Sequence, residues 1–208
     1  VWDYAEANPF SNSGGNILLH IEKIAKVIEY LPSNIIGSSI QKDAAEPFEH
    51  SEVVISTDPP YYDNIEYADL SDYFYVWMRK GLKNIFPTLF STLLVPKEAE
   101  IVASPYRFDN DNDAKNHFEE KLKKSFENMR KSCNKEFPVS IFYAFRQQEM
   151  TVENNVASTG WETMLNGLID TGFNIIGTWP VRTESPGRIL ARGANALASS
   201  IVLVCRPK

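Results

Sequence analysis

Four consecutive residues, Asp58-Pro59-Pro60-Tyr61, combine groups that can bind and activate an amino group on a planar ring. The lone pair of such an amino group is delocalised into the ring, so an acceptor at each N–H bond is needed to make it available. The Asp58 carboxylate and the Pro59 carbonyl can be these acceptors, because proline fixes φ and holds its carbonyl in place. The Tyr61 ring can stack on a nucleic-acid base that has left its helix. The alternative is an ordinary turn after a strand.

The elements around this turn place it where ligands bind in α/β proteins. Residues 52–57 are an apolar run that predicts a buried strand, and Asp58 follows its carboxyl end. Ser71 predicts the N-cap of a helix over residues 72–82, whose aromatic residues we expect to pack in the core. Between turn and helix, Tyr62, Asn64 and Tyr67 are expected to line a pocket for the base. For Tyr67, packing against the edge of the sheet is an equal alternative.

The rest of the chain predicts strands that alternate with helices. Helical spacing of apolar residues predicts a helix over residues 16–30, and a charged amphipathic pattern predicts a solvent-facing one over 114–132. A capping box, Thr159 to Glu162, opens a third helix that ends at Gly172. The predicted strands cover residues 35–40, 52–57, 100–104, 137–145, 174–181 and 200–205. This order predicts one α/β domain over residues 1–208, with a helical segment at 1–34, a sheet core at 35–208 and an antiparallel end.

Composition restricts the class of protein. The chain has 208 residues, of which 43% are hydrophobic, and it has no apolar run of the length that crosses a membrane. Cys133, Cys205 and three histidines are too scattered for a zinc site, so we expect buried thiols in a reducing cytoplasm and no metal. A net charge of −6 argues against a domain that binds DNA through electrostatic attraction alone. The chain starts at Val1 and not at a methionine, so we expect it to be a fragment of a larger protein.

The turn and its surroundings resemble a known family. Asp58-Pro59-Pro60-Tyr61 resembles motif IV of the amino-methyltransferases, which modify N6 of adenine or N4 of cytosine. The longer runs at 57–65 and 67–74 resemble the large adenine-specific DNA methylases that carry the DUF1156 domain, as do residues 2–10 and 160–179. The resemblance covers most of the chain.

The resemblance implies a Rossmann-like fold that depends on S-adenosylmethionine and ends in an antiparallel hairpin. It implies a site-specific DNA-methyltransferase that acts on a flipped base, with Asp58, Pro59, Pro60 and Tyr61 as its catalytic turn. Asp43 and Asp58 are the residues expected near the cofactor. An exposed turn aspartate is an equal alternative for Asp43.

One part of the family pattern is missing. A strand followed by F-x-G-x-G, which would hold the cofactor, does not occur in this chain, and the glycines of residues 12–16 precede a helix. We therefore expect the glycine-rich loop to lie upstream in the parent polypeptide and this chain to bind S-adenosylmethionine weakly. Arg182, Arg188 and Arg192 lie in a glycine-containing stretch between the last two predicted strands and are expected to contact DNA phosphates. A solvated loop is the alternative.

Three other acceptors suit the same turn, because each presents a planar amino group: N4 of cytosine, an RNA base and a glutamine side chain. A different class of function is a DNA-binding module that keeps the fold without catalysis.

Overall fold

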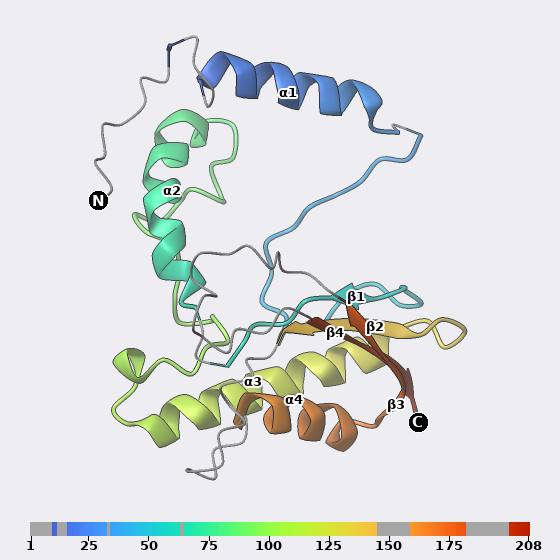
Figure 1. Cartoon of the computed structure of the whole chain (residues 1–208). Helices are drawn as coiled ribbons and strands as arrows, with labels where there is room; N and C mark the ends of the chain where they lie inside the picture. The colour runs from blue at the N-terminus through green and yellow to red at the C-terminus, as the bar shows by residue number, and fades with distance from the viewer. Residues whose placement is uncertain (1–9, 12–15, 33, 63–64, 145–158, 182–199) are drawn as a thin grey trace, which may run out of the picture. The chain divides into compact units, whose positions relative to one another are not determined.

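The computed structural model describes residues 10–11, 16–32, 34–62, 65–144, 159–181 and 200–208. The chain divides into two compact units, Val1–Ile40 and Gln41–Lys208. Each unit is described by itself below (Figure 1). No helix in the described part of the chain is long and apolar enough to cross a membrane.

The N-terminal unit contains the helix α1, Ile17–Tyr30, as the apolar spacing predicts. Asn16 caps it, because its Oδ1 accepts a hydrogen bond from the Leu19 N–H at 2.8 Å. The strand predicted over residues 35–40 is wrong: this segment has no strand, and Ile35 and Ile36 are exposed. Two isoleucines beside Gly37 and two serines form no strand without a partner, and no described residue pairs with them.

A four-stranded sheet forms the centre of the larger unit. Its strands are β1 (Ser56–Thr57), β2 (Val139–Ala144), β3 (Phe173–Val181) and β4 (Ser200–Pro207), in the spatial order β1-β2-β4-β3. β1 runs parallel to β2, whereas β4 pairs antiparallel with both β2 and β3. The mixed sheet with an antiparallel end therefore confirms the predicted class at the level of α/β.

β1 is much shorter than the predicted strand over residues 52–57. Val53 makes only an isolated bridge to Cys133, and Val54 is exposed. β1 pairs with β2 alone among the described residues, which makes it an edge strand whose alternate residues face outward. The apolar run indicated the right position but overstated the burial and the length.

Two helices cover one face of the sheet: α3 (Asp111–Ser132) and α4 (Thr159–Asp170) (Figure 1). The expectation that the helix near 114–132 faces solvent is wrong for one side of α3. Its residues at helical spacing are buried, namely Ala114, Phe118, Leu122 and Phe126. They form one cluster with Ile141 and Leu203 of the sheet and with Met164 and Leu168 of α4. The charged residues of α3 hid this apolar stripe in the sequence.

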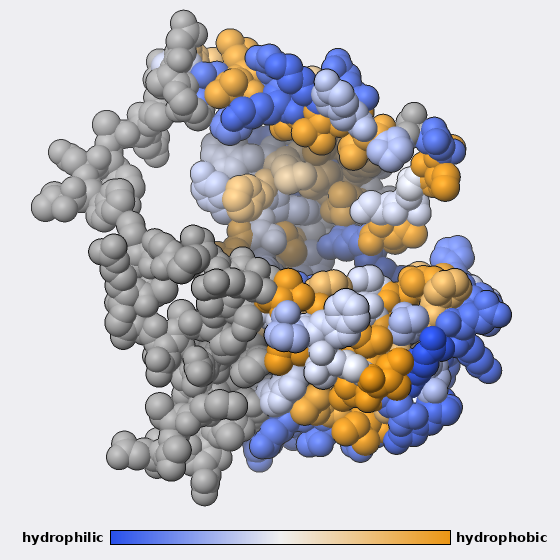
Figure 2. Space-filling model, turned by 45° about the vertical axis from the view of Figure 1, so that its right-hand side comes forward, coloured by the Kyte–Doolittle hydropathy of each residue, from blue (hydrophilic) through white to orange (hydrophobic). Residues whose placement is uncertain are grey.

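The helix α2 begins at Tyr67 and ends at Leu82, so Ser71 lies inside it and is not its N-cap. Only one of its aromatic residues packs in the core as predicted, because Tyr75 is buried while Tyr73, Phe74 and Trp77 are 70%, 63% and 61% exposed. Many other large hydrophobic side chains of the described residues are exposed, and Figure 2 shows orange areas on the surface of the molecule. The loop that follows α2 packs against the side of α2 that carries Tyr75. The Tyr75 hydroxyl donates a hydrogen bond to the Thr92 carbonyl of this loop at 3.0 Å.

The segment at residues 100–104 forms no strand, contrary to prediction, although residues 101–104 are buried; it leads into a short 3₁₀ helix, η1 (Pro105–Arg107). α4 ends as predicted near Gly172, which has a φ of +88°, a conformation that favours glycine.

Candidate functional site

The turn Asp58 to Tyr61 leaves β1 at its carboxyl end. Because β1 and β2 are parallel, the carboxyl ends of both strands lie at the same edge of the sheet. Asp58 is exposed, whereas Pro59 is buried. The turn therefore presents a carboxylate to solvent at the edge where open α/β sheets bind ligands, as predicted.

A hydrogen bond joins the two ends of this turn. The Tyr61 hydroxyl donates to Asp58 Oδ1 at 2.9 Å. Among the described residues, no other group donates a hydrogen bond to the Asp58 side chain. None of these residues therefore occupies Oδ2, which can accept a hydrogen bond from a ligand. Partial burial, followed by the hydrogen bond to the Asp58 carboxylate, raises the pKa of Tyr61 to about 12. At neutral pH the phenol is therefore a donor.

The Tyr61 ring packs on an aromatic side chain of the sheet, which in turn lies against one of α4. Its centroid lies 5.4 Å from that of Tyr143 in an edge-to-face arrangement, and Tyr143 lies 5.6 Å from Trp161. Tyr143 is buried in β2, and Trp161 belongs to the first turn of α4. Strand and helix thus fix the ring of Tyr61 from one side.

Tyr62 packs inward. Its carbonyl accepts a hydrogen bond from the Ala103 N–H at 2.8 Å, and its ring meets Phe118 of α3 edge to face at 5.1 Å. A Cβ added to Gly160 would lie 3.0 Å from the Cβ of Tyr62. Tyr62 therefore anchors the turn to α3 and α4, and its predicted contact with a substrate stays a prediction.

The remaining predicted substrate and DNA residues divide into two groups. Tyr67 is half-exposed at the start of α2, close enough to raise the pKa of Tyr61 slightly. Asn64 lies outside the described residues, as do Arg182, Arg188 and Arg192. The glycines at positions 14 and 15 also lie outside them. No group of three metal-binding side chains occurs in the part of the chain that the structure describes.

Asp43 has protein partners for both of its carboxylate oxygens. Oδ1 accepts a hydrogen bond from the Ala45 N–H at 2.8 Å, and Oδ2 accepts one from Lys121 Nζ at 2.9 Å. Asp43 does precede a turn, since its carbonyl accepts a hydrogen bond from the Glu46 N–H, but its side chain is only 15% exposed, so it is not an exposed turn aspartate. Burial alone would raise the pKa of Asp43, but the bonds from Lys121 and Ala45 outweigh it and the pKa falls below its ordinary value.

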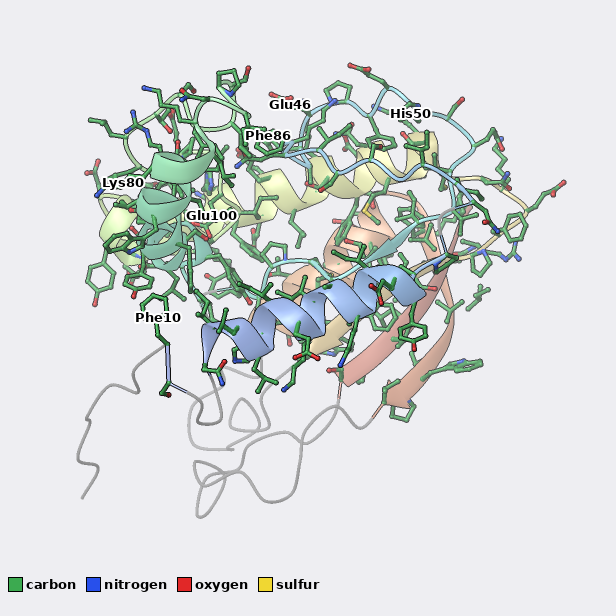
Figure 3. All side chains as sticks on the ribbon, turned by 90° about the horizontal axis from the view of Figure 1, so that it is seen from above. Phe10, Glu46, His50, Lys80, Phe86 and Glu100 are labelled. Carbon is green, nitrogen blue, oxygen red and sulfur yellow. The ribbon has the colours of Figure 1, made fainter. Side chains whose placement is uncertain are left out.

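A charged network that the sequence did not reveal supports the chain just after the turn. Glu100 Oε1 accepts a hydrogen bond from the Ala68 N–H at 3.0 Å, and Oε2 accepts one from Arg107 at 2.6 Å. Arg107 also pairs with Asp69 of α2. Glu100, labelled in Figure 3, contacts α2 through its carboxylate and His117 of α3 through its carbonyl. The buried Ser104 donates to Glu66, the residue before α2. No pattern in the sequence links Glu66, Ala68 and Asp69 to their partners in this network, because each pair is 32 to 38 positions apart.

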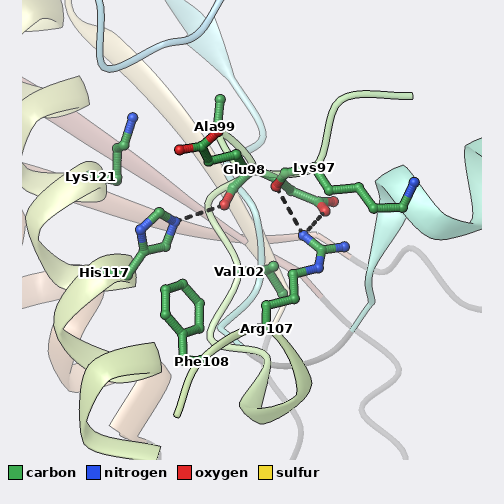
Figure 4. Close-up of a pocket in the computed structure, with 9 residues that line it drawn as sticks. Lys97, Glu98, Ala99, Val102, Arg107, Phe108, His117 and Lys121 are labelled. Atoms are coloured by element: carbon green, nitrogen blue, oxygen red, sulfur yellow. Dashed lines mark hydrogen bonds and ion pairs between the residues drawn. The ribbon is translucent and has the colours of Figure 1, made fainter. Parts of the chain in front are cut away.

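A pocket of about 720 Å³ lies beside this network (Figure 4). His117 and Lys121 line it from α3, and Glu98, Glu100 and Arg107 from the segment before α3. His117 Nε2 lies 3.0 Å from the Glu100 carbonyl. Arg107 and Lys121 are each paired with carboxylates, so the pocket has little positive charge to offer an anion. None of its lining residues belongs to the turn at Asp58.

Comparison with known proteins found no matching family model, no similar curated protein and no similar solved structure.

Proposed function

We propose that this chain forms the base-binding part of a DNA-methyltransferase that depends on S-adenosylmethionine and acts on N6 of adenine. The observation that carries the proposal is the exposed Asp58 carboxylate at the carboxyl end of β1. Its Oδ1 accepts a hydrogen bond from Tyr61, and its Oδ2 has no hydrogen-bond donor among the described residues.

The chemistry of the turn suits an exocyclic amino group. Asp58 Oδ2 and the Pro59 carbonyl can each accept one N–H of the amino group, which directs the nitrogen lone pair out of the ring plane. Pro59 and Pro60 both have a fixed φ, so these acceptors keep their positions. The amino group needs no base before attack, because its nitrogen can lose a proton after methylation.

The fold supports the same proposal. The resemblance implies a sheet that ends in an antiparallel hairpin, and β3 and β4 form such a pair, with β4 inserted next to β2. The helices α3 and α4 cover one face of this sheet, as in layered α/β proteins.

The described residues fit the methyl donor only in part. S-adenosylmethionine, when bound, supplies a methyl group on a positively charged sulfur. The exposed Asp58 carboxylate suits the neighbourhood of that charge. Asp43 fits less well, because both of its oxygens already have partners in Lys121 and Ala45. The glycine-rich loop expected from the resemblance would supply the main cofactor contacts.

Methylation of DNA by the protein expressed from its complete gene tests the proposal. The protein is incubated with duplex DNA and deuterated S-adenosylmethionine, and the digested DNA is analysed by mass spectrometry. We expect labelled N6-methyladenine, and we expect Asp58→Ala to abolish it. Asp109→Ala, a change at another exposed aspartate, should leave it unchanged.

Other outcomes distinguish the alternatives. Labelled N4-methylcytosine, or label in RNA or in a glutamine side chain, would retain the amino-methylation chemistry and replace the proposed substrate. DNA binding without any labelled product would contradict catalysis and favour a binding module.

A further inference from the structure

Tyr61 contacts Asp58 through its hydroxyl group, and stacking on a base does not require that group. We propose that Tyr61 is a positioning residue, whose hydroxyl holds Asp58 Oδ1 so that Oδ2 is aimed at the amino group of the substrate. The inference rests on the proposed function, because it assigns a second role to a residue of the same site.

The hydrogen bond restricts a side chain that would otherwise rotate. The outer torsion of an aspartate has broad minima, so an exposed carboxylate samples many orientations. A donor at 2.9 Å on Oδ1 removes this freedom. The two residues between Asp58 and Tyr61 are prolines, whose fixed φ limits the motion of the backbone between donor and acceptor.

The donor is itself held in place. The Tyr61 ring packs edge to face on the buried Tyr143 of β2, which in turn lies against Trp161 of α4. The turn is also fixed on its other side, where the Ala103 N–H donates to the Tyr62 carbonyl. Contacts with β2, and through it with α4, and with the segment at Ala103 therefore help to fix the orientation of the Asp58 carboxylate.

The raised pKa of Tyr61 agrees with this geometry, because a phenol with a pKa of about 12 stays protonated at neutral pH. The Tyr61 hydroxyl thus donates to Asp58 at neutral pH.

Tyr61→Phe separates the two roles, since phenylalanine keeps the stacking ring and loses the hydroxyl. With the protein from the complete gene, we expect kcat for DNA methylation to fall about tenfold, as expected when a hydrogen bond to a charged group is lost. The KM for DNA and the fluorescence of 2-aminopurine at the target position should stay unchanged, because base binding is retained. Tyr61→Ala should in addition raise KM. Tyr106→Phe is the control, because Tyr106 is 93% exposed.

Two results would overturn the inference. One is a wild-type kcat for Tyr61→Phe when Asp58→Ala abolishes methylation. The proposed function would then be retained, and the positioning role of the Tyr61 hydroxyl would be lost. The other is a Tyr61→Phe variant that raises KM as much as Tyr61→Ala, which would make the hydroxyl part of base binding. Failure of the wild-type protein to methylate any amino group would contradict the proposed function itself.

The hydrogen bond can be tested without catalysis in the 208-residue chain. Nuclear magnetic resonance of ¹³C-labelled tyrosine follows the titration of Tyr61, and the Tyr61→Phe variant identifies its signal. We expect the pKa of about 12 to fall in Asp58→Ala while staying above 10, because burial also raises it. An identical pKa in both proteins would overturn the contact between the two side chains.

Discussion

The carboxylate of Glu100 accepts a hydrogen bond from the N–H of Ala68, 32 residues earlier in the chain, and so caps the start of α2. α2 needs this distant acceptor, because Glu66 at its N-cap position makes no side-chain cap of its own. The same carboxylate binds Arg107, and the Glu100 carbonyl meets His117 of α3. Glu100 therefore links the start of α2, and with it the chain that follows the turn at Asp58 to Tyr61, to the core helix α3.

Replacement of Glu100 should destabilise the larger unit. In Glu100→Ala the Ala68 N–H loses its acceptor and Arg107 keeps Asp69 as its remaining carboxylate partner. We expect the free energy of unfolding in urea to fall by about 2 kcal/mol, the usual cost when a partly buried charged hydrogen bond is broken. Glu98→Ala changes an exposed neighbour and should leave the unfolding midpoint in place. Equal stability of the two variants would contradict the capping role.

Gly160 is required by close packing at the start of α4. A Cβ at this position would lie 3.0 Å from Tyr62 Cβ and 3.1 Å from the Tyr143 hydroxyl oxygen, tighter than ordinary contact. We expect Gly160→Ala to lower the free energy of unfolding by about 1–2 kcal/mol, because overpacking outweighs the better helix propensity of alanine.

Gly81 is the matched control for this change. It lies in α2, and an added Cβ would meet nothing within 4 Å. Gly81→Ala should therefore raise the free energy of unfolding by about 0.5–1 kcal/mol through helix propensity alone. If both variants gain stability in the same urea titration, the contact between α4 and Tyr62 is looser than the structure indicates.

Elements with a strong local pattern of residues could be predicted from the sequence alone. The helix α1 follows from its apolar spacing, and β2, β3 and β4 follow from runs of β-branched and aromatic residues. The position of Asp58 at the end of β1 follows from a local motif as well. These features depend on residues that are close together in the chain.

Features that depend on distant partners escaped the sequence analysis. The inner face of α3 is buried only because β2, β4 and α4 pack on it, and its many lysines and glutamates suggested a solvated helix. Glu100 caps α2 from another segment, so no local signal identifies it. Asp43 was expected either near the cofactor or in an exposed turn, and its pairing with Lys121, 78 positions away, was not foreseen.

The ion pair between Asp43 and Lys121 should make stability depend on acid pH. The pKa of Asp43 is lower in the folded protein than its ordinary value of 3.8, so its contribution is complete above about pH 4 and is lost as the pH falls through the folded value. In urea titrations, Asp43→Asn should be less stable than the wild-type chain at pH 7, and the difference should shrink below pH 3.8. Asp109→Asn, at an exposed position, should show no such trend. A constant difference across pH would contradict the ion pair.

The engaged oxygens of Asp43 also predict weak binding of the methyl donor by this chain alone. Without a free carboxylate at that position, few described groups can hold the adenosine part of S-adenosylmethionine. Isothermal calorimetry with S-adenosylmethionine and the 208-residue chain should show no binding in the micromolar range. A micromolar dissociation constant would show that other residues of this chain form the cofactor site.

Both cysteines should resist thiol reagents as long as the protein is folded. Cys205 lies in β4 with none of its surface exposed, and burial raises its pKa to about 11; burial also raises the pKa of the Cys133 thiol. Because the thiolate is the reactive form, a disulfide reagent at pH 8 should label neither residue rapidly in the native chain. Labelling should become rapid only in urea, at the concentration where the intrinsic fluorescence reports unfolding. Cys133→Ala and Cys205→Ala variants assign the two rates, and fast native labelling of Cys205 would contradict its place between β2 and β3.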